Sequence, residues 1–418
     1  MKILFISDVS LEQPASGSEQ VLFHQTNGLA GSGVAVWAVT RRIDAECGGP
    51  TENLGGLSVI HYHNYSNRLP GFIAVMIRLI SDRLSKIFAT ERFDAIVAHQ
   101  PLVFSFLCWL RSIRKLPLVY IFHSPWHEEY LLNNERRSNA VLLIPTIIRK
   151  HIERYCVKRA DQVIVLSEYM KHRVMRTHAV KAENIVVNPG GADTQRFKWA
   201  PNREKLKSQL GFPPNKVHLL TVRNLEQRMG LDRLIRGMTR IKKAYPQTYL
   251  IIGGNGSERQ RLEDLVRQRG LEQDVRLTGF IPPERLPDYY AAADFFVMPT
   301  RRLEGFGLVT VESLSCGTPV LGTPVGGTPE ILKPLSPDFI FQDNTPQALA
   351  DGILYNIQNY FEDKDVYAAL RRKCRSYAVD KYSWDRHIRL LTEVLNRYSG
   401  AKQASISNAD HFEHQGNH

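Results

Sequence analysis

Short apolar runs recur along the sequence, and each is followed by a longer stretch whose apolar residues have helical spacing. Alternation of this kind is typical of βα units that build a parallel sheet. The runs are apolar on both faces, as strands covered by helices on each side must be. We therefore predict an α/β fold of doubly wound parallel sheets. The predicted strands are Lys2–Ser7, Val34–Val39, Asp94–Ala98, Leu118–Phe122, Gln162–Leu166, Ile185–Val187, Val217–Val222, Thr248–Ile252, Val275–Leu277, Phe295–Met298 and Pro319–Leu321.

The length of the chain predicts two such domains. It has 418 residues, whereas a single α/β core rarely exceeds about 300. A polar stretch with three prolines at Arg196–Pro214 is the natural break, because a fresh βα series follows it. We expect one Rossmann-like domain over 1–200 and a second over 201–383, with their ligand in the cleft between the carboxyl ends of the strands. A last helix over 384–398 is expected to pack back on the first domain, and the polar tail 399–418 is expected to be disordered.

The charge and the cysteines narrow the class of protein. A net charge of +12 and a pI of 9.4 favour an anionic partner: nucleotide phosphates, an anionic membrane surface or nucleic acid. A merely basic surface explains the same charge. Nucleic acid is the weaker alternative, since no known binding module accompanies it. The dispersed, odd set of cysteines indicates a reducing compartment without disulfides or zinc. These are Cys47, Cys108, Cys156, Cys316 and Cys374.

No segment has the run of about 18 apolar residues that a membrane-spanning helix needs. The first residues are typical of a buried strand rather than of a signal peptide, because Asp8 ends their apolar run. We therefore expect a cytoplasmic protein. Arg68–Arg92 mixes apolar and basic residues. A helix there could lie on anionic lipid, as a peripheral contact with the cytoplasmic face of a membrane, or pack against its own domain.

The segment Asp294–Leu332 has the richest chemistry. A buried strand is followed by a loop with Glu304, two glycines and a predicted helix that begins near Leu308 and carries Glu312. Glycines let backbone approach a ligand closely, and free N–H groups at a helix start bind pyrophosphate. An ionised Glu312, one turn inside the helix, can accept two hydrogen bonds from a ribose diol. Glu304 can reach a sugar hydroxyl beyond the phosphates.

Other signatures are absent or out of place. Asp363-Lys364-Asp365 matches a D-x-D metal motif, but a charged helix start after no core strand is the simpler interpretation. Gly254-Asn255-Gly256 lacks the third glycine of a dinucleotide-binding loop, so no nicotinamide cofactor is expected. A phosphate loop of the G-x-x-x-x-G-K type and a G-x-S-x-G elbow are also missing. We predict no metal and no cofactor. Histidines in the tail have no framework to fix a metal site: His411, His414 and His418.

The Asp294–Leu332 segment resembles the E-x7-E region of the family 4 glycosyltransferases, which are retaining enzymes of the GT-B fold. The similarity extends from Met1 to about Tyr398. It includes Asn188–Asp193 with Phe197, similar to the N-G-V-D-x-x-x-F signature of the family. Two further segments are similar to turns of the family. Leu250–Gly256 resembles its G-x-G turn after the second strand of the C-terminal domain, and Thr278–Phe280 resembles the turn whose backbone faces the nucleotide base.

The resemblance implies roles for single residues. Glu312 would hold the ribose, Glu304 the donor sugar, and Gly17 would approach the phosphates or the transferred sugar. Ser18 departs from the family, which often has a second glycine there. His123 matches the histidine near the sugar, although a purely structural histidine is the alternative. Glu304 and His123 are the expected catalytic residues, together with an arginine discussed next. Further donor contacts are expected at Gly254, Phe280, Gly305, Phe306, Gly307, Leu308 and Val309.

The phosphate clamp departs most from the family. The pattern is roughly G-R-L-x-x-x-K-G, but here Asn224 and Met229 occupy the arginine and lysine places. Arg223 and Arg228 each precede one of these places. A guanidinium can bind phosphate oxygens as well as an ammonium can. We hypothesise that both arginines contact the donor through a one-residue shift, with Arg228 catalytic. The alternative is a weakened clamp with low activity.

We therefore predict a metal-independent, retaining glycosyltransferase that moves a sugar from a nucleoside-diphosphate sugar to a glycan or lipid-linked acceptor. Polysaccharide or glycolipid assembly is the expected setting. Two other classes stay open. A nucleotide-sugar epimerase or sugar phosphorylase could use the same architecture, and the altered clamp would suit a non-catalytic subunit that binds a nucleotide sugar.

Overall fold

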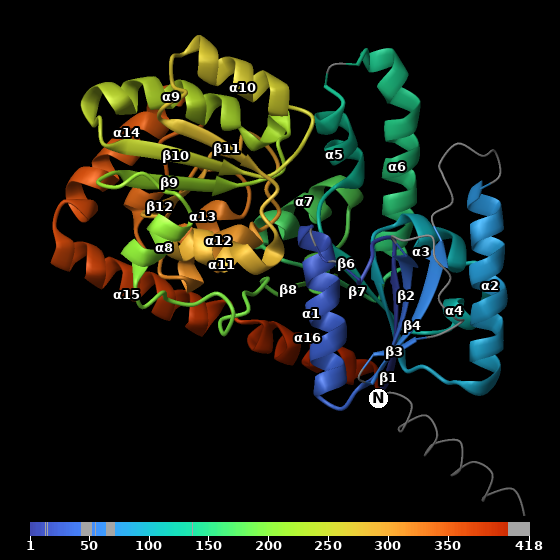
Figure 1. Ribbon diagram of the computed structural model, residues 1–418. Helices are drawn as coiled ribbons and strands as arrows, with labels where there is room; N and C mark the ends of the chain where they lie inside the picture. The colour runs from blue at the N-terminus through green and yellow to red at the C-terminus, as the bar shows by residue number, and fades with distance from the viewer. Residues whose placement is uncertain are drawn as a thin grey trace, which may run out of the picture.

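The computed structural model describes residues 1–12, 14, 16–42, 52–54, 56–63, 72–135 and 137–399. They form two α/β domains that stand side by side (Figure 1). The predicted disordered tail lies outside the described residues from position 400 on, together with its histidines, and so does Cys47. The other four cysteines are buried as free thiols: Cys108, Cys156, Cys316 and Cys374.

The N-terminal domain has a sheet with the strand order β3-β4-β2-β1-β5-β6-β7-β8. Its strands are β1 (Lys2–Ser7), β2 (Ala35–Arg42), β3 (Glu52–Leu54), β4 (Leu57–His63), β5 (Ala95–His99), β6 (Leu118–Phe122), β7 (Gln162–Val165) and β8 (Ile185–Val187). Among the strands that the structure describes in this domain, β3 alone is antiparallel to its neighbour. The helices are α1 (Gly17–Gly31), α2 (Phe72–Thr90), α3 (Leu102–Leu107), α4 (Arg111–Arg114), α5 (Trp126–Asn133), α6 (Asn139–Arg159) and α7 (Glu168–His178).

The C-terminal domain has a parallel sheet with the order β11-β10-β9-β12-β13. Its strands are β9 (Val217–Val222), β10 (Thr248–Gly253), β11 (Val275–Gly279), β12 (Phe295–Met298) and β13 (Val320–Gly322). Its helices are α8 (Arg203–Gln209), α9 (Leu231–Ala244), α10 (Arg259–Gln268), α11 (Leu286–Ala292), α12 (Leu308–Ser315), α13 (Thr328–Leu332), α14 (Pro346–Asn356) and α15 (Lys364–Lys381). The 3-10 turn η2 (Gln227–Met229) lies between β9 and α9.

Both sheets reverse their strand order at one point, between β1 and β5 in the first and between β9 and β12 in the second. Loops leave in opposite directions at such a point, so that a crevice opens at the carboxyl ends of the strands. The strands beside the crevice are almost wholly buried. The predicted fold class is confirmed, since apolar strands covered on both faces have few other arrangements.

The last helix, α16 (Trp384–Ser399), returns to the N-terminal domain and packs across α1 (Figure 1). A Cβ on Gly28 of α1 would lie 2.6 Å from Cγ1 of Ile388, so the two helices meet with no room for a side chain at that position. His24 of α1 stacks on Trp384, with their ring centroids 4.4 Å apart.

Nine of the eleven predicted strands have the observed limits to within one residue, and two strands were missed. The missed pair is β3 and β4, because Ser58 and His61 interrupt the apolar run of β4. The end predicted for the second strand, at Val39, is wrong as well. β2 continues to Arg42 because Thr40, Arg41 and Arg42 pair with β4.

The amphipathic segment Arg68–Arg92 forms α2 within its described part. Ile80 and Leu84 are buried in the core of the N-terminal domain, and Ile77 packs against the same core. Packing against its own domain accounts for these side chains. None of the helices within the described residues has both the length and the apolar character needed to cross a bilayer.

Candidate active site

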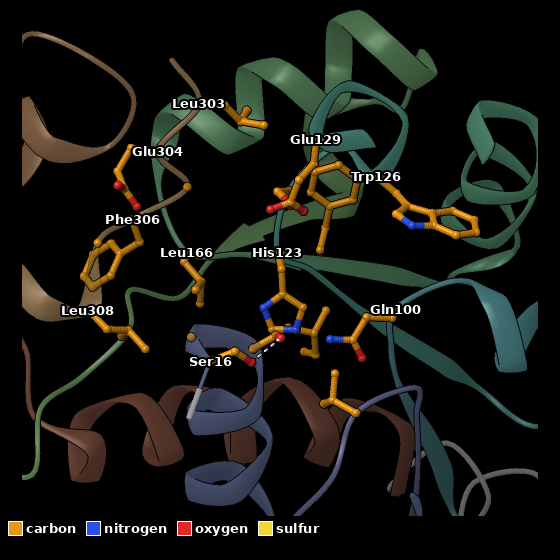
Figure 2. A pocket seen from close by; sticks show the side chains of 18 of the residues that line it. Ser16, Gln100, His123, Trp126, Glu129, Leu166, Leu303, Glu304, Phe306 and Leu308 are labelled. Atoms are coloured by element: carbon orange, nitrogen blue, oxygen red, sulfur yellow. Dashed lines mark hydrogen bonds between the residues drawn. The ribbon is translucent and has the colours of Figure 1, made fainter. Parts of the chain in front are cut away.

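A cavity of about 580 Å³ opens between the two domains at the carboxyl ends of their strands. Figure 2 shows His123 in the middle of the cavity, with Glu304 on the side of the C-terminal domain and Trp126 on the other. Of the predicted site residues, the cavity brings together Gly17, His123, Arg223, Arg228, Glu304, Gly305, Phe306, Gly307, Leu308 and Val309.

Two helices begin at this cavity. On the N-terminal domain, Ser16 caps α1 in a capping box with Glu19, so that α1 starts at Gly17 and Ser18 in the cavity wall. On the C-terminal domain, α12 starts after Gly307, whose φ of +88° is readily adopted only by glycine. The first backbone N–H groups of a helix have no partner within it, and they carry the positive end of the helix dipole. Both helix starts therefore suit an anionic ligand.

The two domains meet closely beside the cavity. A Cβ on Gly305 would lie 2.8 Å from the carbonyl oxygen of His123, so a larger residue would push the domains apart. Ser167 donates a hydrogen bond to the carbonyl of Gly305 (2.6 Å). Glu330 of α13 accepts hydrogen bonds from the backbone N–H groups of Glu168 (2.8 Å) and Tyr169 (2.6 Å), and so caps the start of α7 across the domain boundary.

Glu304 is buried and forms an ion pair with Arg223. Its carboxylate also accepts a hydrogen bond from Thr300 Oγ1 (3.3 Å). The guanidinium of Arg223 lies against the sulfur atoms of Met229 and Met298. Arg223 therefore reaches the cavity from a largely apolar setting, with Glu304 as its one charged partner among the described residues.

Arg228 joins the two domains. It donates to the carboxylate of Glu129 on α5 (2.9 Å) and to the carbonyl of Leu303 (3.0 Å). Its side chain is mostly buried. Both arginines of the hypothesised clamp thus line the cavity, and each is bound to a carboxylate there.

Helix α5 is anchored by a buried carboxylate. Glu153 of α6 is 1% exposed and accepts hydrogen bonds from the backbone N–H of Trp126 (2.8 Å) and from the rings of His127 and His178 (3.1 Å each). Burial alone would raise the pKa of Glu153, but the hydrogen bonds from the two histidines hold it below its usual value. This network fixes the helix that presents Glu129 to Arg228.

A chain of buried hydrogen bonds connects His123 to α16. The carbonyl of Pro189 can only accept, so His387 donates to it from Nδ1 (2.7 Å). His387 Nε2 then accepts from the amide of Gln25 (2.9 Å), whose oxygen accepts from His99 Nε2 (2.9 Å). His99 Nδ1 is left to accept from His123 Nε2 (3.0 Å). The order of donors therefore assigns the Nε2–H tautomer to His123 and leaves its Nδ1 as an acceptor.

The histidines of this chain are held in the neutral form. Burial lowers the pKa of both His123 and His387 to about 4. Burial also holds the pKa of His99 well below its usual value. At neutral pH, His123 is thus a hydrogen-bonding group rather than a cation.

Two family models match the chain. "Glycosyl transferases group 1" matches residues 202–381, and "Glycosyltransferase Family 4" matches residues 15–196. The chain belongs to the group 1 glycosyltransferases. The two matches meet near the predicted domain break, so that each model corresponds to one of the two α/β domains.

Relatives of this glycosyltransferase have various stated activities. The GDP-mannose-dependent alpha-(1-6)-phosphatidylinositol monomannoside mannosyltransferase of Mycolicibacterium smegmatis is 30% identical over 254 residues. These are 59% of this chain and 64% of that enzyme, so the match spans less than two thirds of the relative. The D-inositol 3-phosphate glycosyltransferase of Corynebacterium aurimucosum is 28% identical over 426 residues, with 97% of each chain covered.

Solved structures confirm the GT-B fold. The sucrose-phosphate synthase of Thermosynechococcus elongatus is similar with a TM-score of 0.79. Its sequence identity is 22%, and the match covers 96% of this chain and 100% of that one. The identity is too low to carry over a substrate, and the similarity is one of architecture.

Three predicted donor-binding residues of the glycosyltransferase do not line the cavity. A Cβ on Gly254 would lie 1.9 Å from the carbonyl oxygen of Arg223, which only glycine permits. Phe280 is 57% exposed just after β11. Glu312 accepts a hydrogen bond from Tyr290 (3.0 Å), and burial raises its pKa to about 7. Their roles toward a donor stay predictions.

Several cavity residues of the glycosyltransferase were missed by the sequence analysis. Asp8 and Gln100 directly follow β1 and β5, the two strands between which the strand order reverses. Ligands bind beside such strand ends, so this position in the sequence could have indicated both residues. Asp8 accepts from the backbone N–H groups of Leu102 (2.9 Å) and Val103 (2.8 Å), and burial raises its pKa to about 6. The sequence around Glu129 does not indicate a place in the cavity, because its partner Arg228 is in the other domain.

Among the described residues, no three His, Cys, Asp or Glu side chains converge as a metal site requires. Asp363 of the D-x-D motif instead caps α15, accepting from the backbone N–H groups of Asp365 and Val366. Metal-independent activity nevertheless stays a prediction.

Proposed function

We propose that the chain is a retaining glycosyltransferase that moves a sugar from a nucleoside-diphosphate sugar to an acceptor hydroxyl without a metal ion. The observation that carries this proposal is the convergence of Arg223, Arg228 and the start of α12 with Glu304 on one cavity between the domains. Such a site offers fixed positive charge for a leaving diphosphate. The name of the mannosyltransferase relative, which is GDP-mannose-dependent, supports a donor of this class.

The ion pair between Arg223 and Glu304 supplies a switch for donor binding. When a diphosphate enters, Arg223 can turn from Glu304 to a phosphate oxygen, and the freed carboxylate can accept from a sugar hydroxyl. Neutral His123 accepts from a second hydroxyl through Nδ1. Negative charge that develops on the leaving oxygen is stabilised by the two guanidinium groups and by the dipole of α12. Contact between the domains at Gly305 excludes water, which would hydrolyse the donor.

The acceptor belongs to the class of glycans or lipid-linked sugars, and the setting is polysaccharide or glycolipid assembly. The wall of the cavity formed by Gln100, Trp126 and Glu129 lies on the N-terminal domain, opposite Glu304. Such a mixture of aromatic and polar side chains suits a sugar ring with several hydroxyl groups.

One experiment tests the donor site. Thermal unfolding is followed with a panel of nucleotide sugars in the presence of a chelator, since a ligand of the folded state raises the melting temperature. The donor selected in this way is then incubated with a panel of acceptors. We expect a clear shift for one donor and transfer without metal. Glu304→Gln keeps the shape of the side chain, and it should lower turnover by about 10²-fold or more. Full turnover in Glu304→Gln, or an absolute need for a divalent cation, would contradict the proposal.

A second candidate follows from the same contacts. Both clamp arginines are already bound to carboxylates, and the family positions hold Asn224 and Met229. A subunit that binds a nucleotide sugar without turnover would have such a clamp. Donor binding with no product across a broad acceptor panel would favour this candidate.

A further inference from the structure

Helix α6 has an unusual apolar surface in its first half. Five large aliphatic side chains within eight residues point to solvent, and we call them the α6 surface. They are Val141 (60% exposed), Leu143 (58%), Ile144 (67%), Ile147 (45%) and Ile148 (52%). Single exposed aliphatic residues are common, but a contiguous group marks an interaction site in most soluble proteins.

The fold itself does not need these side chains. The opposite face of α6 packs into the domain through Leu142, Cys156 and Val157, which are at most 2% exposed. The N-terminal half of α6 rises beside α5 beyond the edge of the sheet (Figure 1). The α6 surface is therefore a protruding ridge rather than the wall of a groove.

The rest of the exposed face of α6 is basic. Lys150, Arg154 and Lys158 follow the α6 surface, and all three are exposed. The only acid in the helix is Glu153, which is buried beneath His127 and His178. The acids of the preceding segment are each paired with an arginine: Glu128 with Arg173, Glu129 with Arg228 and Glu135 with Arg302. The exposed face of α6 thus combines aliphatic residues with basic residues that form no ion pair with any acid the structure describes.

We propose that the α6 surface docks on an anionic lipid bilayer. A helix with aliphatic side chains and basic residues on its exposed face lies in the interfacial region of a bilayer, where the chains are buried and the charges contact headgroups. The charge also argues against a second copy of the chain as the occupant. A two-fold contact with the two α6 helices parallel would bring Lys150, Arg154 and Lys158 of one copy toward the same residues of the other.

The location of the surface connects the bilayer to the cavity. Leu142, on the inner side of the same helical turns, lines a groove of about 850 Å³ together with Leu131 and Leu132. Leu303 lines both this groove and the cavity between the domains. Charged residues line the groove as well, among them Glu128, Arg173 and Arg302. A lipid-linked acceptor in the bilayer at α6 would therefore reach the cavity along a groove with both apolar and charged walls. This step rests on the proposed function, whereas docking itself does not.

Vesicle sedimentation tests the docking. The full chain is mixed with vesicles of phosphatidylcholine alone, or of phosphatidylcholine and phosphatidylglycerol in equal parts. We expect the protein to sediment with the anionic vesicles, and to be released at about 1 M salt, where charges are screened beyond about 3 Å. The double variant Ile144→Ser, Ile148→Ser should lower the partition constant by about tenfold or more. Lys150→Glu with Arg154→Glu should lower it on anionic vesicles only.

The matched control replaces two exposed aliphatic side chains on a different helix. Val366→Ser with Val379→Ser changes residues of α15 that are 42% and 39% exposed, and it should leave sedimentation unchanged. Gel filtration of all proteins detects a dimer. Absence of sedimentation by the native chain, an equal loss in the control, or a dimer abolished by Ile144→Ser, Ile148→Ser would each overturn the proposal.

Donor binding separates this proposal from the proposed function. The α6 variants should keep the nucleotide-sugar thermal shift of the native chain, because α6 contributes only Glu153 to the cavity. Vesicle binding without any sugar transfer would leave docking in place and reject the enzyme activity. Transfer to a soluble acceptor without vesicle binding would support the enzyme activity and reject docking.

Discussion

His123 Nε2 lies 3.0 Å from His99 Nδ1, and the hydrogen between them belongs to His123. This assignment is imposed from the far end of the chain, where His387 can only donate to the carbonyl of Pro189. The tautomer of a cavity residue is therefore determined by the contact between α16 and the turn after β8.

Gln25→Leu breaks this hydrogen-bond chain in the middle. His99 then loses the acceptor at Nε2, and its proton can move to Nδ1, where it opposes the proton of His123. We expect mixed tautomers of His123 by ¹⁵N NMR, a fall in kcat that exceeds the change in KM, and a loss of about 1–3 kcal/mol in unfolding free energy. Thr26→Val is the control, because Thr26 is buried on the same helix and bonds only within it. A single unchanged tautomer in Gln25→Leu would refute the assignment.

His24 provides a pH-dependent test of stability outside the cavity. Burial lowers its pKa to about 4 in the folded state, against about 6.5 in an unfolded chain. Between these values the unfolded chain binds more protons, so the contribution of His24 to stability is lost as the pH falls from about 6.5 toward 4. His24→Phe keeps a ring on Trp384 but cannot titrate. Its stability relative to the native chain should rise by about 1–2 kcal/mol between pH 8 and pH 5, as measured by urea unfolding. An equal difference at both pH values would contradict this account.

Arg228 and Glu129 give a test of the shifted clamp. Arg228→Ala should weaken binding of the selected nucleoside diphosphate by about tenfold or more, since hydrogen bonds to charged groups contribute about 1.5–3 kcal/mol. Glu129→Gln leaves the guanidinium in place and should not weaken binding. Calorimetry measures both affinities. If the two variants lose affinity equally, Arg228 acts only as a connection between the domains and not as a phosphate ligand.

Glu330 caps α7 from the other domain, and its removal should favour domain separation. Glu330→Ala leaves two N–H groups at the start of α7 without their partner, at a cost of about 1 kcal/mol. We expect a larger radius of gyration by small-angle X-ray scattering and a raised KM for the donor. Glu330→Gln retains an acceptor oxygen and should stay close to the native values. Identical scattering in Glu330→Ala and the native chain would show that the cap does not hold the domains together.

Local patterns were sufficient to predict the fold and many of the residues that line the cavity. Strands such as β6 and β12 are apolar on both faces and end at a loop, so their limits follow from a few consecutive residues. The start of α12 was predicted correctly for the same reason, because glycines precede an apolar helical stretch. β4 was missed where His61 is buried despite its polarity.

Contacts between distant segments could not be predicted in this way. Gln25 and His387 are joined only because α16 returns to α1, and no spacing within either helix indicates it. The partner of Arg228 depends on how the domains face each other. The exposure of Ile144 was equally hidden, since α6 has apolar residues around much of its circumference and only packing decides which of them remain in solvent.

The contact between Gly28 and Ile388 has a consequence during synthesis of the chain. A ribosome releases the first domain long before α16 emerges, so the face of α1 that meets α16 stays uncovered while the second domain is made. Domains generally fold in the order in which they are translated. Here the N-terminal domain is translated first, but it is complete only when α16 has been made. Between the synthesis of α1 and that of α16, the apolar face of α1 is exposed to solvent. We expect chaperones to bind the nascent chain during this period.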